Sequence, residues 1–475
     1  MTTQTVDLAD VQGLLRYGFK HHTESVFLAL RVRDRAAARA WLAQAPITNA
    51  VPQASLPATV LQVALGAEGL AALGVAGDIA AAFSPEFISG LAGLPERSRR
   101  LGDTGANDPA DWAWGSGPRC AHVLLLLYAL PGGLDAFEND IQAQCASAFD
   151  AVARLTTTDM GGVEPFGFTD GISQPEVDWD GKRRMGDEDK VLRYGNEVCL
   201  GEFVLGYRNE YGLYADRPLL DPQRDPQALL PRAEDHPDQA DLGRNGSYLV
   251  LRQLEQDVAG FWRWITEATH GDATERELLA AAMVGRTKTG EPLAGCGDRG
   301  LNRFDFDTDP DGLRCPLGAH VRRANPRTAD MPAGTGGPVS QLVRTLGFDA
   351  AARRHDLVAS ARLHRLLRRG REYSLDGGTR QGLHFVALNA NIARQFEFVQ
   401  TAWIASAHFD GLSGEVDPLL GTRSPSSAGD AADAFSRPGE DQPNRRETGL
   451  PQFVTVRGGG YFFLPGLRAL RYLLE

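Results

Sequence analysis

A single histidine, His320, stands within the stretch from Cys315 to Arg327, between small apolar residues and a cluster of arginines. An imidazole nitrogen can bind a metal ion, and guanidinium groups are suited to pair with carboxylates. Small neighbours would let a flat ring approach the histidine. These residue types predict an axial ligand of haem iron, with arginines beside the haem propionates. The alternative is a surface histidine beside an arginine-rich loop.

Two further stretches carry residues that could do chemistry. Gly167 to Pro175 places one acid, Asp170, between glycines in a loop that ends at a proline. Taken alone, this is an ordinary turn, because Asp-Gly is a common turn dipeptide. The stretch from His364 to Tyr373 contains Arg368-Arg369-Gly370, and the other arginines around it make a solvated basic face the alternative.

Taken together and in this order, the three stretches resemble the dye-decolorizing peroxidase family. Members carry a GxxDG loop, a later histidine in a Cys-Pro to Pro-Arg context, and an Arg-Arg-Gly element. The length of the chain and the segment Leu205 to Gly212 resemble the longer subgroup. The resemblance implies an α+β fold of two ferredoxin-like halves, with antiparallel sheets and peripheral helices. The halves would pack sheet to sheet in a barrel-like arrangement, and the C-terminal half would hold haem b.

The resemblance also implies the chemical roles. His320 would be the axial iron ligand and Asp170 the distal acid–base group. Arg368 would be the distal cation, with Arg369 as the second candidate. Such an enzyme reduces hydrogen peroxide to water through a ferryl intermediate and oxidises phenols, dyes or other one-electron donors. The ordinary pKa of an aspartate, roughly 4, predicts a pH optimum below neutrality.

Four further residues are predicted to contact the haem. Leu383 and Phe385 match the family's Gly-Leu-x-Phe strand, whose side chains line the distal side, although both could simply pack in a core. Arg327 and, more weakly, Arg323 are candidates for the haem propionates by charge. An axial histidine usually has a carboxylate or carbonyl partner. The nearest acid before the last strand is Glu447, and the partner stays unassigned.

The composition is that of a globular protein with an acidic balance. The chain has 475 residues, enough for two or three domains, and is 43% hydrophobic and 23% charged. Its formal net charge of -12 argues against a nucleic-acid partner and against anionic membranes, since both need basic surface. A homo-oligomer is left open.

Targeting and redox signals predict a cytoplasmic protein. The N-terminus shows no secretory signal. The longest apolar run, Val123 to Leu130, is far shorter than the roughly 20 residues that span a membrane. The five cysteines are scattered and form no CxxC pair, so reduced thiols are predicted rather than disulfides or a zinc site.

Hydrophobic patterning indicates which elements position these stretches. Predicted strands are Ser25–Val32, Ala58–Leu65, His122–Leu130, Gly201–Tyr207, Ser247–Arg252, Leu383–Leu388 and Phe453–Phe463. Predicted helices are Ala36–Ala45, Gly132–Arg154, Glu255–Ala268, Arg276–Val284, Ile392–Ile404 and Leu467–Leu474. The polar segment Asp417–Gly449 predicts a long surface loop.

The same order of strands and helices in each half indicates a duplicated α+β unit. Residues 217–241 are rich in Pro, Asp and Arg and read as a connection. The predicted domains are therefore 1–216, with the Asp170 loop, and 242–475, with His320.

Two alternatives compete with the peroxidase prediction. The first is a haem carrier or iron-release protein on the same scaffold, which would need His320 but neither Asp170 nor Arg368. The second is an α+β protein without haem, in which the three motifs are coincidental.

Overall fold

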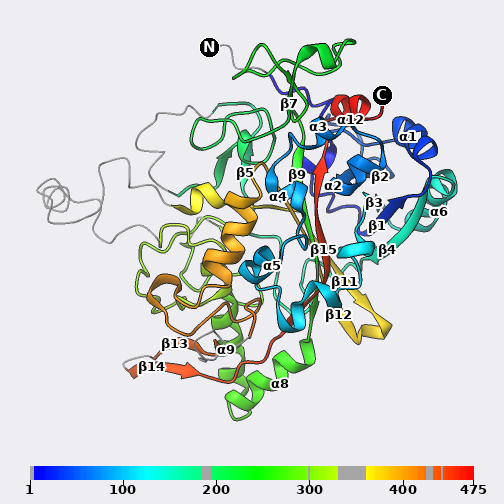
Figure 1. The fold of residues 1–475 in the computed structure, drawn as a ribbon. Helices are drawn as coiled ribbons and strands as arrows, with labels where there is room; N and C mark the ends of the chain where they lie inside the picture. The colour runs from blue at the N-terminus through cyan, green and yellow to red at the C-terminus, as the bar shows by residue number, and fades with distance from the viewer. Residues whose placement is uncertain (1–4, 183–193, 298–299, 330–359, 424–431, 440–441) are drawn as a thin grey trace, which may run out of the picture.

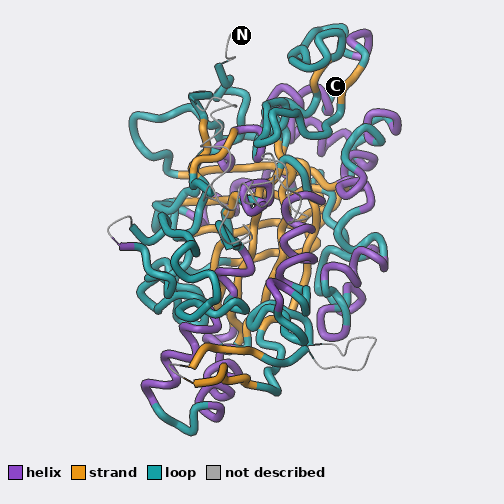
Figure 2. The backbone as a smooth tube through the Cα atoms, turned by 90° about the vertical axis from the view of Figure 1, so that its left-hand side faces the viewer, coloured by secondary structure: helices purple, strands orange, loops and turns teal. Residues whose placement is uncertain are grey.

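The computed structural model describes residues 5–182, 194–297, 300–329, 360–423, 432–439 and 442–475 (Figure 1). Its centre is one sheet, with helices and loops on both sides (Figure 2). The strands of this sheet are β1 (Glu24–Val32), β2 (Thr59–Gly66), β3 (Val123–Ala129), β4 (Phe149–Thr156), β9 (Ser247–Gln256), β10 (Leu367–Arg368), β11 (Arg371–Leu375), β12 (Arg380–Asn389) and β15 (Val454–Leu464). Their order is β10-β12-β9-β15-β2-β3-β1-β4, with β11 paired to β12. Strands covered on both faces are apolar throughout, and every residue of β3 is buried.

The two halves of the chain repeat one arrangement. In the first half, β1, α1 (Arg35–Gln44) and β2 are followed by β3, α6 (Leu134–Cys145) and β4. In the second half, β9, α8 (Val258–Ala268) and the short strands β10 and β11 are followed by β12, the helical segment 393–404 and β15. The strand orders β2-β3-β1-β4 and β10-β12-β9-β15 correspond position by position. This β-α-β-β-α-β pattern is ferredoxin-like, and it confirms the predicted α+β class with antiparallel strands and peripheral helices.

Strand β15 joins the two halves edge to edge. It pairs with β9 along its length and with β2 through Phe462 opposite Gly66 and Phe463 opposite Leu65. At the far ends of the sheet, the strands β4 and β11 come close, where Thr158 N donates to Glu372 O at 2.8 Å. Within the described residues, no ladder pairs β4 with β10 or β11, so the sheet does not close into a barrel. The halves thus join edge to edge in one open sheet, and not in the sheet-to-sheet, barrel-like packing that was predicted.

Helix ends bring one cavity residue into place. Helix α9 (Ala273–Val284) begins at Asp272, whose carboxylate accepts from Thr274 N at 2.8 Å. It ends at Gly285, whose φ of 92° is a left-handed conformation that glycine adopts readily. Arg286 follows directly and lines the cavity described below. In the described ranges, none of the helices is long and apolar enough to cross a bilayer.

The predicted helix Gly132–Arg154 is wrong in its second part. Helix α6 ends at Cys145, and β4 follows and pairs with β1. An alanine-rich sequence favours a helix in isolation. Here the ladder with β1 and the burial of Phe149 and Leu155 override that preference.

The predicted strand Gly201–Tyr207 is also wrong. Its first residues form a short 3₁₀ turn, and Glu202 is buried in an ion pair with Arg394 at 2.8 Å. The segment is as apolar as a strand because it is buried in the core, not because it joins the sheet. The predicted helix Ile392–Ile404 is helical, with π-helical turns over Ala393–Glu397 and Val399–Ile404.

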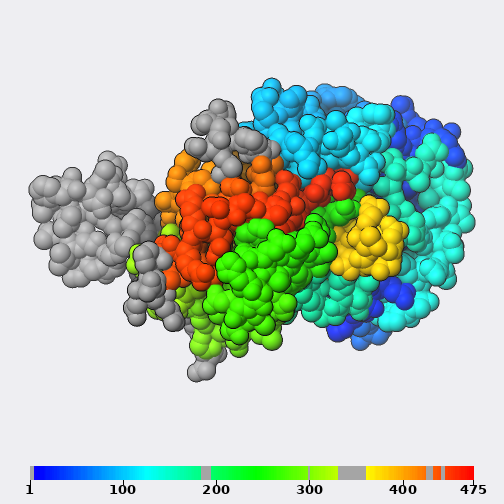
Figure 3. Space-filling view, turned by 90° about the horizontal axis from the view of Figure 1, so that it is seen from below, coloured from blue at the N-terminus to red at the C-terminus, as the bar shows by residue number. Residues whose placement is uncertain are grey.

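The segment Asp417–Gly449 is more structured than predicted. Within its described part lies a hairpin of β13 (Phe435–Gly439) and β14 (Gln442–Glu447). Arg437 fixes the hairpin to α9, since its Nη1 lies 3.1 Å from Glu275 Oε2. Figure 3 shows this orange-red segment against the green helices α8 and α9. The polar composition therefore reflects an ion-paired hairpin as well as loop.

Candidate active site

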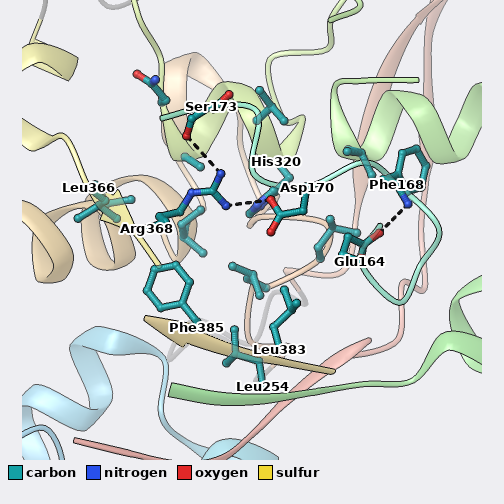
Figure 4. A pocket seen from close by; sticks show the side chains of 18 of the residues that line it. Glu164, Phe168, Asp170, Ser173, Leu254, His320, Leu366, Arg368, Leu383 and Phe385 are labelled. Atoms are coloured by element: carbon teal, nitrogen blue, oxygen red, sulfur yellow. Dashed lines mark hydrogen bonds and ion pairs between the residues drawn. The ribbon is translucent and has the colours of Figure 1, made fainter. Parts of the chain in front are cut away.

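A cavity of about 240 Å³ lies on the face of β9, β12 and β15 in the second half (Figure 4). The loop 164–175 of the first half, α10 (His320–Ala324) and the helical segment 393–404 cover it. Most of the lining is apolar. Five predicted site residues meet there: Asp170, His320, Arg368, Leu383 and Phe385.

Glycines shape the loop that carries Asp170. Gly167 and Gly171 have φ values of 100° and 74°, which favour glycine. The backbone N–H of Asp170 donates to Gly162 O at 2.9 Å. These features hold the main chain of the loop so that the Asp170 carboxylate faces the cavity (Figure 4).

Arg368 lies beside this carboxylate. Its Nη1 is 3.1 Å from Asp170 Oδ1, and its Nη2 donates to Ser173 O at 3.2 Å. The second candidate, Arg369, points elsewhere: its guanidinium donates to the carbonyls of Leu14 and Leu15 at 2.9 and 3.3 Å. Of the two arginines, Arg368 is the one that lines the cavity.

The charges around Asp170 keep it ionised. Burial alone would raise the pKa of its carboxyl, but the Arg368 guanidinium, the N–H of Gly171 and the more distant His320 outweigh burial and hold the pKa below its ordinary value. Glu164, the other acid lining the cavity, behaves in the opposite way, because burial raises its pKa. Two carboxyl groups in one cavity thus have pKa values pushed apart.

Gln174 joins the Asp170 loop to the strand that carries Arg368. Its Oε1 accepts from Arg368 N at 3.2 Å, and its Nε2 donates to Arg368 O at 3.1 Å. Both bonds act on the backbone of Arg368. Gln174 can therefore set the position of the arginine without touching its guanidinium.

His320 opens helix α10, and its side chain borders the cavity. Its Nδ1 lies 2.9 Å from Oδ2 of Asp417, whose side chain is fully buried. The other oxygen, Oδ1, accepts from the N–H groups of Leu419 and Leu420 at 2.9 and 2.8 Å. Although burial alone would lower the pKa of His320, the carboxylate of Asp417 raises it. With Nδ1 engaged, Nε2 is the ring nitrogen left to bind a metal.

Asp417 is the partner that the sequence left unassigned. It lies 97 positions after His320 in the chain, inside the segment predicted to be surface loop. Its local signal is an acid before Pro418 and two leucines, which suits an Asx turn with a buried apolar flank.

Leu383 and Phe385 lie on β12 and face the cavity, whereas Gly382, His384 and Val386 point to the other, fully buried face. The alternation follows from the strand period of two. In Figure 4 both side chains lie across the cavity from Asp170. They supply apolar surface that would exclude water from it.

Arg323 and Arg327, predicted from their charge to meet propionates, lie outside the cavity lining. Arg323 is fully buried and donates to the carbonyls of Trp403 and Glu415 at 2.8 and 2.6 Å. Arg327 is also fully buried, and its guanidinium lies 3.8 Å from the centre of the Phe304 ring. The structure uses these two charges to hold loops around His320.

Besides Arg368, the arginines that border the cavity are Arg286 and Arg365. Arg365 stacks on the Tyr194 ring at 4.8 Å, and the hydroxyl of Tyr194 accepts from Asn325 Nδ2 at 3.0 Å. The Oδ1 of Asn325 is buried without a partner among the described residues. Arg286 donates to Ser173 Oγ at 2.9 Å. Arg365 stood in a stretch already singled out, but nothing in the sequence of Arg286 marked it.

The residues present fit the predicted haem. An imidazole nitrogen borders a mostly apolar cavity, and a carboxylate orients the imidazole. Arg286 and Arg365 at this cavity provide positive charge for an acidic edge. The Asp170–Arg368 pair lies in the same cavity, where a small molecule between the pair and the cofactor could be bound and its proton moved.

Comparison with known proteins gives a consistent picture. No protein-family model matches the chain. It is 28% identical over 505 residues to "Dye-decolorizing peroxidase msp1" of Mycetinis scorodonius, with 99% of this chain and 88% of that protein covered. It is 29% identical over 437 residues to "Multifunctional dye peroxidase DyP2" of Amycolatopsis sp., with 87% and 82% covered. A solved structure, a dye-decolorizing peroxidase in complex with 2,6-dimethoxyphenol, superposes with a TM-score of 0.71 at 25% identity and covers 99% of this chain and all of that one.

Proposed function

Since the chain belongs to the dye-decolorizing peroxidase family and is a haem-dependent peroxidase, we propose that Asp170, Arg368 and His320 carry its reaction. The observation that supports these roles is the 3.1 Å contact between Arg368 Nη1 and Asp170 Oδ1 inside the cavity that His320 borders. A carrier of haem needs the histidine alone. An ionised acid beside a fixed cation is the arrangement that proton transfer to and from peroxide requires.

Asp170 takes and returns one proton. Its carboxylate accepts the proton from the near oxygen of hydrogen peroxide and delivers it to the far oxygen, which leaves as water. Arg368 stabilises the negative charge that develops as the O–O bond lengthens. His320 would hold the iron of a bound haem, and the haem would supply the electrons for that cleavage. Asp417 fixes the tautomer of His320 through Nδ1, and Leu383 and Phe385 exclude water.

An absorption spectrum tests the function directly. Haem-supplemented protein should show a Soret band that changes on addition of one equivalent of hydrogen peroxide and returns when a phenol is added. A Soret band that does not respond would favour the carrier alternative. A protein that binds no haem would contradict the role of His320.

We extend this proposal to the electron donors, the cellular compartment and the domain limits of the protein. Phenols and dyes are the proposed donors, and a related peroxidase has been solved with 2,6-dimethoxyphenol. All five cysteines are free, which supports a cytoplasm where thiols stay reduced. We also propose that 1–216 and 242–475 are the two domains and 217–241 their connection.

Replacing Asp417 should weaken the binding of haem by His320 or its reaction with peroxide. In Asp417→Asn the group facing His320 Nδ1 loses its charge, while shape and the turn are kept. Haem affinity or the rate with peroxide should fall about 10- to 100-fold, measured by titrating apo-protein with haem and by stopped-flow absorption. Glu415→Gln is the matched control, because this acid of the same loop accepts from Ser436 N at 2.9 Å and does not contact His320. Equal behaviour of the two variants would contradict the role of Asp417.

Gln174→Ala should slow the reaction with hydrogen peroxide about tenfold, because two hydrogen bonds to the backbone of Arg368 are lost. A displaced Arg368 stabilises the Asp170 carboxylate less, so the acidic limb of the pH–rate profile should move to higher pH. A purely structural residue would lower protein yield or haem content and leave that limb in place. Gln381→Ala serves as control, since Gln381 bonds Ser374 Oγ at 3.4 Å and lies outside the cavity lining.

A further inference from the structure

A smaller cavity adjoins the wall of the proposed haem cavity. It has a volume of about 50 Å³ and shares Leu254, Phe385 and Phe396 among its lining with the larger one. The polar residues Asp103 and Arg252 line only the smaller cavity. We call this space the side chamber. Because Leu254 and Phe385 border both spaces, the chamber lies next to the cavity that Asp170 faces. Figure 4 labels these two side chains in the larger cavity.

Two buried charges meet in the side chamber. Arg252 Nη2 donates to Asp103 Oδ1, and the two side chains are 4% and 1% exposed. Two further atoms of the pair, Arg252 Nε and Asp103 Oδ2, are buried with no hydrogen-bond partner among the described residues. Buried atoms of charged groups are rarely left unpaired in folded proteins. Because Arg252 and Asp103 also line a cavity, a small molecule there could bond both atoms.

The neighbouring polar groups already have partners. Asn107 donates from Nδ2 to Thr422 Oγ1 at 3.3 Å and accepts at Oδ1 from Val456 N at 2.9 Å. Thr422 donates to Gly102 O at 2.5 Å. The ion pair thus leaves one buried donor, Arg252 Nε, and one buried acceptor, Asp103 Oδ2.

Size and charge define the class of ligand. One water needs about 10–15 Å³ of such space, so the chamber holds a few water-sized molecules but no aromatic ring. The Arg252–Asp103 pair is neutral as a whole, and Asp103 would repel an anion as Arg252 would repel a cation. The ligand is therefore small, uncharged, and both a donor and an acceptor of hydrogen bonds.

We propose that the side chamber binds hydrogen peroxide, with Arg252 Nε donating to one oxygen and Asp103 Oδ2 accepting from an O–H group. This site rests on the proposed function, in which peroxide is the substrate that fits the class. Peroxide held there lies behind Leu254 and Phe385, directly beside the cavity where Asp170 acts. The chamber raises the local supply of the small oxidant while excluding aromatic donors.

The test compares two peroxides. Asp103→Asn replaces the acceptor by an amide, and Val456→Leu narrows the chamber without touching the pair. Stopped-flow rates are measured for hydrogen peroxide and for cumene hydroperoxide, which is too large for the chamber. In both variants the rate with hydrogen peroxide should fall about tenfold and the rate with cumene hydroperoxide should stay within about twofold.

Asp241→Asn is the matched control. Asp241 is a buried acid 2.7 Å from Arg217 Nε, and it too has an unpartnered oxygen, but it lines neither cavity. Its ratio of the two rates should equal that of the wild type. A ratio unchanged in Asp103→Asn and Val456→Leu would mean that the chamber holds water only, and would overturn the proposal. Failure of the proposed function looks different, since the wild type would then react with neither peroxide.

Discussion

Replacing Asp170 by alanine should lower the rate of reaction with hydrogen peroxide by about two to four powers of ten. The variant loses the group that we propose moves a proton between the two peroxide oxygens. Haem should remain bound, because Asp170 does not contact His320. The measurement is the second-order rate of the absorption change in stopped flow, at equal haem content of both proteins.

The other acid of the cavity should not replace Asp170. Glu164 Oε1 accepts from Phe168 N at 3.0 Å, and Oε2 accepts from Phe166 N at 3.0 Å and from Gln256 Nε2 at 2.8 Å. Burial also raises the pKa of Glu164, so more of it is already protonated at acidic pH and cannot accept a proton. A loss of less than about fivefold in Asp170→Ala would therefore contradict the assigned role.

Asp159→Ala provides the control for this variant. Asp159 lies earlier in the same loop region, is exposed, and accepts from Gly161 N at 2.9 Å. It carries the same charge as Asp170 but lies outside the cavity lining. Its removal should leave the peroxide rate within about twofold, since an exposed charge is well screened.

Local hydrophobic patterns in the sequence were enough to predict most strands of the sheet. Strands such as Val123–Ala129 are continuous apolar runs, and their short length favours a strand over a helix. The pattern failed where pairing decides the structure. Phe149–Thr156 contains alanine and charged residues that suit a helix, and only its position beside β1 makes it a strand.

In the candidate site, too, some residues could be predicted from local sequence and others could not. Asp170, Arg368 and His320 stand in short motifs, so their residue types and order were readable. Asp417 was not, because its contact with His320 joins segments 97 positions apart. The charge of Arg323 predicted a contact with a haem propionate. In the structure this side chain is fully buried and donates to backbone carbonyls. A sequence shows that an arginine is charged but not which acceptor lies in front of it.

Arg368→Leu should change both the rate and its dependence on pH. Loss of the cation that stabilises developing charge should lower the peroxide rate about 10²- to 10³-fold. Arg368 is also the largest of the groups that lower the pKa of Asp170, against the raising effect of burial. Without it, burial dominates and the pKa of Asp170 should rise above the ordinary value for aspartate.

The sign of the pH effect follows from the form of Asp170 that reacts. In the proposed mechanism the ionised carboxylate accepts the proton, so the rate is lost as the pH falls through the pKa of Asp170. In the wild type that loss should come at a pH below the ordinary pKa of an aspartate, because the pKa of Asp170 is lowered. In Arg368→Leu it should come at higher pH. Arg368→Lys keeps a charge beside the acid, so its acidic limb should stay near that of the wild type while the rate falls less. Identical acidic limbs in the leucine variant and the wild type would separate Arg368 from the ionisation of Asp170, and would leave the contact of 3.1 Å without the electrostatic role assigned to it.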